Sequence, residues 1–342
     1  MVKFGTAACV ALVASAIAAD RPALAQQKEE VTFAMPAITF AFVPAYIAQD
    51  LGFWTKQGLE VKLPVITGIG AMNAVLSRSA EFSISSIPTI IRAQARGQKV
   101  VAIAGAFEGT AVELVLRKDL ANAAGLTHLA PLDRRAAALK GRTVAILAPN
   151  TIVHAYLRYF ARRGGIDPER DFKLSIMSQP ASIAALQTRD VDAMAQVLPY
   201  STIAIHNGSA VLLSSGPQGD LPELLPFQLN GIMARPDYCE QKPRVCTAMV
   251  AGYGQGVRFL HERTSEAKAI LRKRIPNMDQ APFDEAFELT RRWTPPEMRI
   301  NEKGIANAQE LMLVGGMMKP EEKLSSFKAI YTNKFVGRGS GS

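Results

Sequence analysis

The sequence predicts an α/β protein of two lobes, each built on a doubly wound, mainly parallel sheet, with two crossover segments joining the lobes. A strand, loop and helix order repeats both before and after residue 110. Extended apolar segments at residues 112–116 and 227–234 would carry the chain into the second lobe and back. The length of 342 residues is enough for two separate cores. We therefore expect a first lobe at residues 26–110 and 231–336, a second lobe at residues 111–230, and a flexible tail at residues 337–342.

The first 25 residues have the three parts of a secretory signal. Lys3 is followed by an apolar run from Thr6 to Ala19, and Ala23-Leu24-Ala25 fits a cleavage site. Cys9 lies inside the apolar run and not behind it, so we do not expect a lipoprotein. No later segment offers the roughly 18 uninterrupted apolar residues of a membrane span. We expect export to the periplasm.

Residues 42–63, FVPAYIAQDLGFWTKQGLEVKL, predict a short helix followed by a strand. Pro44 suits the first turn of a helix because its missing N–H would be unpaired there in any case. Gly52 is a suitable stop. We expect Phe53 and Trp54 to fill the core beneath this helix rather than to contact a ligand.

Alternating apolar and polar residues predict two strands around this helix, at residues 31–35 and 59–63. Strands joined by a helix imply a parallel pair, and open α/β sheets bind their ligands at the carboxyl ends of such strands. The loop at residues 36–43 lies there. The rest of the first lobe is predicted as a helix at 72–77, a strand at 82–84, a loop at 85–89 with Ser86 as N-cap, a helix from Pro88 to Arg96 and a strand at 100–104.

The second lobe repeats the same order. Its clearest element is a helix from Ile152 to Arg163 that Gly164 and Gly165 end. The other elements are predicted as strands at 143–147, 172–176, 191–195 and 211–213 and helices at 182–188 and 199–207. From Pro243 onward the pattern is mostly helical, at 245–262, 265–274, 284–293 and 305–314, and we assign these helices to the first lobe.

Three segments resemble ABC-transporter solute-binding proteins of the nitrate, sulfonate, taurine and thiamine-precursor group. In that family a Pro-Ala-Tyr helix is followed by Gly-Phe-Phe or Gly-Phe-Trp and by Gly-Leu-Glu-Val, as at residues 44–61 here. Residues 138–169 and 183–194 match the family's second-lobe segments. The resemblance implies a type II periplasmic-binding-protein fold and delivery of a small solute to an ABC permease at the inner membrane. Residues 122–137 depart from the family because they form a longer link between the lobes. We expect a monomer.

The sequence contains no motif for catalysis, for a metal or for phosphate binding. The four histidines are widely separated, and no G-x-S-x-G, H-E-x-x-H or G-x-x-x-x-G-K-[ST] occurs. Gly252, Gly254 and Gly256 interrupt a helical stretch that no strand precedes, so we expect close helix packing there rather than dinucleotide binding. We predict no enzyme activity, no cofactor and no metal. The alternative is an enzyme of the same fold that acts on a sulfinate or a pyrimidine.

The net charge limits the partners that we expect, and the cysteines indicate a disulfide. Without Lys3, Asp20 and Arg21 of the signal, the chain carries 37 basic and 29 acidic residues, a net charge of +8. The basic residues are scattered and export argues against nucleic acid, so none is expected. Cys239 and Cys246 remain after cleavage, and an oxidising compartment favours a disulfide between them over two free thiols. They follow the return crossover, away from the loops of the cleft, so we expect them to be structural.

The loops predicted at the carboxyl ends of strands contain no lysine or arginine. An anionic head group would therefore be held by helix N-terminal amides and by hydroxyls. Aromatic residues in these loops suit an organic body, so we expect a small carboxylate or sulfonate, aromatic ones included, rather than nitrate or bicarbonate. A pyrimidine thiamine precursor is the alternative. The candidate ligand-binding residues are Thr39, Phe40, Phe42, Ser85, Ser86, Thr89, Phe107, Glu108, Asn150, Thr151, His154, Gln196 and Tyr200.

Several of these residues fit a structural role as well. Asn150 and Thr151 fit an ordinary helix cap, and a cap can also contact a ligand. His154 fits packing, and Glu108 fits hydration at the hinge. Tyr200 fits either closure over the ligand or capping of a helix face. The sequence leaves these alternatives open.

Overall fold

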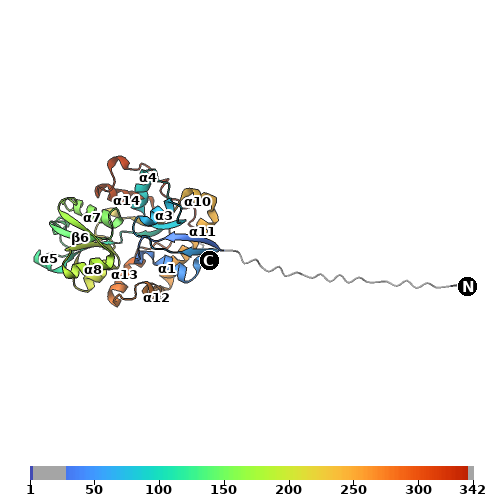
Figure 1. The fold of residues 1–342 in the computed structure, drawn as a ribbon, viewed down its shortest axis with the longest axis horizontal. Coiled ribbons are helices and arrows are strands. Elements are labelled where there is room, and N and C mark those ends of the chain that lie inside the picture. Colours follow the sequence, from blue (N-terminus) through green and yellow to red (C-terminus); the bar gives the residue numbers. More distant parts are fainter. Residues whose placement is uncertain (3–27, 338–342) are drawn as a thin grey trace.

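The structure is a computed structural model that describes residues 1–2 and 28–337. Two five-stranded sheets divide these residues into two lobes, which lie side by side in Figure 1. The predicted signal segment, apart from its first two residues, and the tail after Gly337 lie outside the described residues.

The sheet of the first lobe has the strand order β2-β1-β3-β10-β4. Phe33 of β1 pairs in parallel with Phe82 of β3, whereas Ile232 of β10 pairs in antiparallel fashion with Ile84. Four strands therefore point one way and β10 points the other. The bounds are Glu29–Ala34 for β1, Leu59–Lys62 for β2, Phe82–Ser86 for β3, Val101–Glu108 for β4 and Gln228–Ala234 for β10.

The second lobe has the order β7-β6-β8-β5-β9, and here β5 is the reversed strand. In both sheets the reversed strand is the one by which the chain enters that lobe from the other. The predicted two-lobed α/β fold is confirmed, with each sheet mixed rather than wholly parallel. The bounds are Val112–Arg117 for β5, Arg142–Ile146 for β6, Phe172–Ile176 for β7, Ala193–Val197 for β8 and Ala210–Ser215 for β9.

Helices cover both sheets and follow the strands in the predicted order (Figure 1). In the first part of the chain they are α1 (Val43–Asp50), α2 (Phe53–Lys56), α3 (Gly70–Leu76) and α4 (Ile87–Ala95). Those between β5 and β10 are α5 (Lys118–Ala123), α6 (Leu132–Ala137), α7 (Ile152–Arg163), α8 (Gln179–Thr188) and α9 (Tyr200–His206). The C-terminal ones are α10 (Pro236–Gln241), α11 (Pro243–Glu262), α12 (Thr264–Arg274), α13 (Gln280–Arg292) and α14 (Glu302–Val314).

Two of the C-terminal helices lie at the junction of the lobes (Figure 1). α13 contacts α9 in the second lobe and the 3-10 turn Phe40–Phe42 in the first. α14 contacts α4 in the first lobe and α7 in the second. Because these helices touch both lobes, the lobe boundaries expected from the sequence stay a prediction.

Some predicted element bounds were wrong. β4 continues through Gly105 to Glu108, beyond the strand predicted at residues 100–104, so Phe107 and Glu108 are strand residues. The cause is a distant pairing, because β10 and the segment at Met298 supply hydrogen-bond partners that local sequence does not reveal. α8 begins at Gln179 instead of Ser182, since Ser178 caps it by accepting the N–H of Ala181. The long link at residues 122–137 contains α6 and the end of α5.

Glycines let α11 pack closely on the opening helices, as the sequence predicts. A side chain at Gly256 would lie 2.2 Å from the carbonyl oxygen of Pro44 in α1. Gly252 lies against the ring of Trp54, whose Nε1 donates a 2.9 Å hydrogen bond to the carbonyl oxygen of Met249. Trp54 is only 2% exposed, so its predicted place in the core is confirmed.

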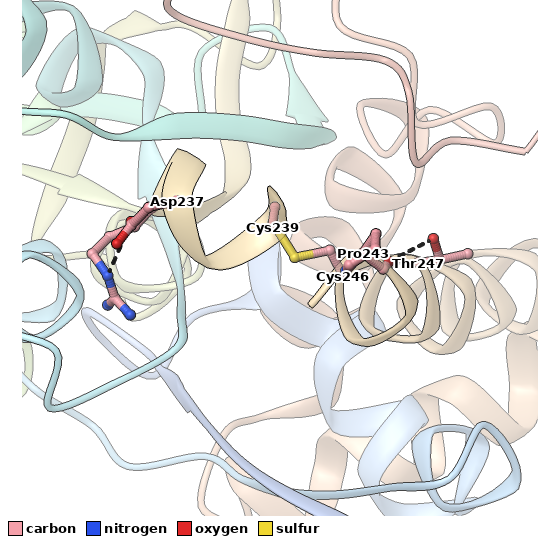
Figure 2. Close-up of a disulfide and its surroundings, with 6 residues drawn as sticks. Asp237, Cys239, Pro243, Cys246 and Thr247 are labelled. Carbon is pink, nitrogen blue, oxygen red and sulfur yellow. Dashed lines mark hydrogen bonds and ion pairs between the residues drawn. A yellow bond between two sulfur atoms is a disulfide. The ribbon is translucent and has the colours of Figure 1, made fainter. Parts of the chain in front are cut away.

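A disulfide joins Cys239 of α10 to Cys246 at the start of α11 (Figure 2). The two Cα atoms are 5.7 Å apart, and both side chains are buried. The bond therefore fixes the corner between two consecutive helices. None of the helices in the described residues is long and apolar enough to cross a membrane.

Candidate functional site

A cavity lies between the lobes, at the carboxyl ends of β1, β3, β6 and β8. Its volume is about 100 Å³. Its apolar wall includes Phe42, Ile69, Met72, Leu147, Ile152 and Leu229, and its polar side chains are Thr39, Ser85, Ser86, Thr89, Thr151, Gln179, Gln196 and Asn230. Among the residues that the structure describes, no charged side chain lines it.

The start of three helices brings polar groups to the cavity. Ser86 and Thr151 are the N-caps of α4 and α7, and Gln179 is the first residue of α8. The hydroxyls of Ser86 and Thr151 accept hydrogen bonds from the N–H groups of Thr89 and His154. Local capping therefore orients these side chains, and the cap role left open for Thr151 is real.

The structure brings seven of the thirteen candidate residues together around this cavity. They are Thr39, Phe42, Ser85, Ser86, Thr89, Thr151 and Gln196. Whether they contact a ligand stays a prediction. The other six candidates, Phe40, Phe107, Glu108, Asn150, His154 and Tyr200, are not part of its wall.

Two aromatic candidates are core residues. The ring of Phe40 packs edge-on against Phe283 of α13, with ring centroids 5.2 Å apart. Phe107 is fully buried within β4. Glu108 ends that strand, and partial burial raises the pKa of its carboxyl group.

Other candidates bridge or border the two lobes. The hydroxyl of Thr39 donates a 2.9 Å hydrogen bond to the carbonyl oxygen of Leu198 in the second lobe. In the reverse direction, the Tyr200 hydroxyl donates to the carbonyl oxygen of Ile38, at 3.4 Å. These contacts hold the lobes together beside the cavity.

A third bridge involves the start of α7. A guanidinium nitrogen of Arg92 in α4 donates to Asn150 Oδ1 at 3.4 Å. The backbone N–H of Asn150 donates to Nδ1 of His154 at 3.2 Å, so that nitrogen is unprotonated. Burial, together with the positive charges of Arg158 and Arg92, lowers the pKa of His154 to about 4.

Two polar lining residues were not among the sequence candidates. Gln179 was missed because α8 was predicted to start three residues later, although Ser178 followed by Pro180 is a usable helix-start signal. Asn230 lies on β10, which was regarded only as a crossover. Strand alternation alone carries no signal that Asn230 faces a cavity.

Two carboxamides in the wall have unpartnered atoms although they are buried. Gln196 is 0% exposed and Gln179 is 6% exposed. Oε1 of Gln196 and Nε2 of Gln179 have no hydrogen-bond partner among the described residues. Buried polar groups are normally paired, so both atoms are available for a hydrogen bond to a ligand.

The described residues show no arrangement suited to a resident metal. No three His, Cys, Asp or Glu side chains in residues 28–337 lie close enough together to hold an ion. The cavity wall there offers hydroxyls, carboxamides and backbone groups only. This set can bind and orient a small molecule by hydrogen bonds.

Comparison with known proteins gives one family and a consistent fold. The model of the family described as NMT1/THI5 like matches residues 39–267, more than half of the chain. No significant match was found among curated protein sequences.

Several solved structures are similar at low sequence identity. A protein from Bordetella bronchiseptica RB50 has a TM-score of 0.78 at 19% identity, over 91% of this chain and 96% of that one. The alkanesulfonate-binding protein SsuA from Xanthomonas axonopodis pv. citri, bound to MOPS, has a TM-score of 0.68 at 15% identity, over 86% and 96%. The periplasmic nitrate-binding protein NrtA from Synechocystis PCC 6803 has a TM-score of 0.67 at 14% identity, over 90% and 87%. At these identities the likeness shows the fold alone.

Proposed function

The chain belongs to the NMT1/THI5-like family, and from this premise we propose that it is the extracytoplasmic solute-binding component of an ABC importer. The observation that carries the proposal is the uncharged cavity between the lobes, with walls from both. Structures of the same fold include an alkanesulfonate-binding protein and a nitrate-binding protein, which supports a binding role. The protein would act in the periplasm as a monomer.

In this proposal the lobes close around one small organic molecule and the closed form is presented to permease subunits at the inner membrane. Residues 26–110 and 231–336 form one lobe and residues 111–230 the other. The seven candidate residues of the wall are the proposed ligand contacts. The apolar side chains of the wall suit an organic body, and its polar side chains suit a single head group.

The protein is proposed to bind its solute without converting it. A catalytic site would need a nucleophile beside a base or a pair of carboxyl groups, and the described wall has neither. If the purified protein, without any transporter, converts a compound that it binds tightly into a product, the enzyme alternative is favoured instead.

A thermal-shift screen tests the proposal. A compound that binds only the folded state stabilises it by about 2.7 kcal/mol at 100 times its Kd. The panel contains aromatic carboxylates, alkyl and aryl sulfonates, pyrimidines, neutral amides, nitrate and bicarbonate. We expect an organic compound to raise the melting temperature, and an Ala111→Phe variant, which fills the cavity, to abolish the shift.

A matched control is Ala184→Phe on the exposed face of α8, which should keep the shift. Stabilisation by nitrate alone would contradict an organic solute. Equal shifts in both variants would show that binding takes place outside the cavity.

A further inference from the structure

The hydrogen-bonding groups of the cavity identify the head group of the solute, and we propose that this protein binds a small uncharged carboxamide. Such a ligand carries an N–H donor beside a carbonyl oxygen on an apolar body. The inference rests on the proposed solute-binding function and deepens it. It differs from the carboxylate or sulfonate expected from the sequence.

Gln196 presents an acceptor whose orientation is fixed. The Ser182 hydroxyl donates its proton to the carbonyl oxygen of Ser178 at 3.1 Å. Its oxygen therefore accepts from Nε2 of Gln196, at 3.0 Å. The amide of Gln196 cannot be turned round without placing its oxygen against an oxygen whose proton is already used. Oε1 is left buried and unpartnered in the cavity wall, so the ligand must bring a donor.

Two of the hydroxyls around the cavity offer acceptors only. Thr39 donates its proton to the carbonyl oxygen of Leu198, and Thr151 donates to the carbonyl oxygen of Ala148, each at 2.9 Å. Both oxygens can still accept a hydrogen bond from a ligand, but neither can donate to an oxyanion. Ser86 and Thr89 hydrogen-bond to each other at 2.7 Å, which leaves one proton of that pair for a ligand. A sulfonate or carboxylate, which only accepts, therefore finds one hydroxyl donor among these residues.

Two of the helix starts at the cavity are depleted in donors. In α4 the second residue is Pro88, which has no N–H, and the N–H of Thr89 is taken by Ser86 at 3.4 Å. α8 repeats this arrangement with Pro180, Ala181 and Ser178. The ordinary anion-binding capacity of a helix start is reduced in both.

The third helix start keeps two donors. In α7 the N–H groups of Ile152 and Val153 have no hydrogen-bond partner among the described residues, and both residues line the cavity. Nε2 of Gln179 adds a third donor to the same wall. A neutral carbonyl oxygen can use these donors, whereas the buried charge of an anion would be offset by no cation in the described wall.

The size of the cavity limits the body of the ligand. Its volume of about 100 Å³ is below the roughly 150 Å³ of a buried cavity that binds benzene, so a small amide fits the lobes as they stand and an aromatic amide needs them to part further. The apolar wall suits the body of such a ligand. On the first-lobe side, the Asn230 carboxamide has no side-chain partner among the described residues and can pair with the free edge of an amide.

Calorimetric titration with matched probes tests the inference. We expect at least one of benzamide, cyclohexanecarboxamide and 2-piperidone to bind at least about tenfold more tightly than benzoate and benzenesulfonate. N,N-Dimethylbenzamide, which keeps the carbonyl but lacks N–H, should lose at least about tenfold relative to benzamide. Equal or tighter binding of the acids, or of the dimethylated amide, would overturn the inference.

Protein variants locate the effect. Gln196→Met keeps the side-chain volume but removes the acceptor, and should weaken binding of the amides at least about tenfold. Gln187→Met, on the exposed face of α8, should leave the affinity unchanged. If Gln196→Met fails to fold, Gln179→Met is the second variant, with the same expected loss. Unchanged affinity in the Gln196 or Gln179 variant that folds would overturn the inference.

The outcomes separate the ligand class from the function. If no amide binds but a carboxylate or sulfonate binds in the cavity, the carboxamide inference is wrong and the solute-binding function stands. If nothing in the panel binds, or if the compounds bind the cavity-filling variant as tightly as the wild type, the proposed function itself is wrong.

Discussion

His154 lies at the start of α7 in its neutral form because burial and the positive charges of Arg158 and Arg92 lower its pKa to about 4. Its Nδ1 also accepts the N–H of Asn150, which requires an unprotonated nitrogen. An unfolded chain protonates the same ring near its ordinary pKa of 6.5. Acid therefore favours the unfolded state in the window between these two values.

From this we predict a pH-dependent loss of stability that depends on His154. The unfolded state binds the proton first, so the free energy of unfolding falls as pH drops from about 6.5 to about 4. With allowance for partial exposure, the loss should be about 1–2 kcal/mol. Urea unfolding at pH 7 and pH 4.5 should show a smaller loss in His154→Gln than in the wild type, whereas His128→Gln should behave as the wild type. An unchanged pH profile in His154→Gln would contradict the prediction.

Glu113 has the opposite pH dependence. The residue is 2% exposed, and its carboxyl group accepts hydrogen bonds from the hydroxyls of Ser201 and Ser215, at 2.6 and 2.8 Å. Burial raises its pKa, so ionisation costs stability as pH rises above its ordinary value of 4.5. We expect Glu113→Gln to gain stability relative to the wild type between pH 4.5 and pH 7 in urea unfolding. A constant difference across this range would show that Glu113 does not titrate there.

The sequence could not identify Glu113 as buried. Val112, Leu114 and Leu116 alternate with it, which is typical of a strand with one face in solvent. In the structure both α9 and α7 pack on β5, and all but the last of its residues are buried. The two serines that contact Glu113 lie 88 and 102 residues away from it along the chain. Its burial therefore depends on elements that the local sequence does not reveal.

The helices and strands that could be predicted are those whose ends carry a signal in the local sequence, such as an N-cap or a stop glycine. α7 has its N-cap at Thr151 and ends at Gly164, and its predicted bounds agree with the structure. β4 and β10 pair over a distance of more than 100 residues, and the extension of β4 was missed. The candidate residues show the same contrast between local signals and distant pairing. Ser86 and Thr151, at helix starts, line the cavity, whereas Phe107, on the missed extension of β4, is a core residue.

The contact of α1 with α11 depends on Gly256, where an added Cβ would lie 2.2 Å from the carbonyl oxygen of Pro44. Gly256→Ala must push the two helices apart, and we expect the free energy of unfolding to fall by about 1–3 kcal/mol. This loss outweighs the gain of up to about 1 kcal/mol in helix propensity. Gly254→Ala is the control on the same helix, because its Cβ would meet only the ends of two flexible side chains, Met298 at 3.2 Å and Arg258 at 3.9 Å. Urea unfolding gives the free energy of unfolding of both variants. Equal stability of the two would contradict a clash at Gly256.

At the scale of the whole molecule, the lobes are joined by more than the two crossover strands. α13 and α14 contact both lobes, and hydrogen bonds cross directly between them beside the cavity. The family resemblance predicted two lobes and a cleft, but it could not predict these bonds. Two of the three, from Thr39 and Tyr200, end on backbone carbonyl oxygens, which side-chain patterns in a sequence do not reveal.

The bond from Thr39 to Leu198 should therefore contribute to ligand affinity rather than to the stability of either lobe. Thr39→Val keeps the shape of the side chain but removes the hydroxyl, which leaves the buried carbonyl of Leu198 without this partner in the closed form. It also removes the acceptor that the same hydroxyl offers to the N–H of Ala41, at 3.4 Å, and to a ligand. A net cost of about 0.5–1.5 kcal/mol corresponds to about a 2- to 12-fold weaker affinity for the strongest binder of the panel, measured by calorimetry. Thr247→Val removes a hydrogen bond of equal length, 2.9 Å to the carbonyl oxygen of Pro243, at the start of α11 (Figure 2). This control lies outside the cavity wall and should bind as the wild type does. Equal affinity of Thr39→Val and the wild type would mean that the bond does not distinguish the closed from the open form, because a contact shifts a conformational equilibrium only by its difference between the two states.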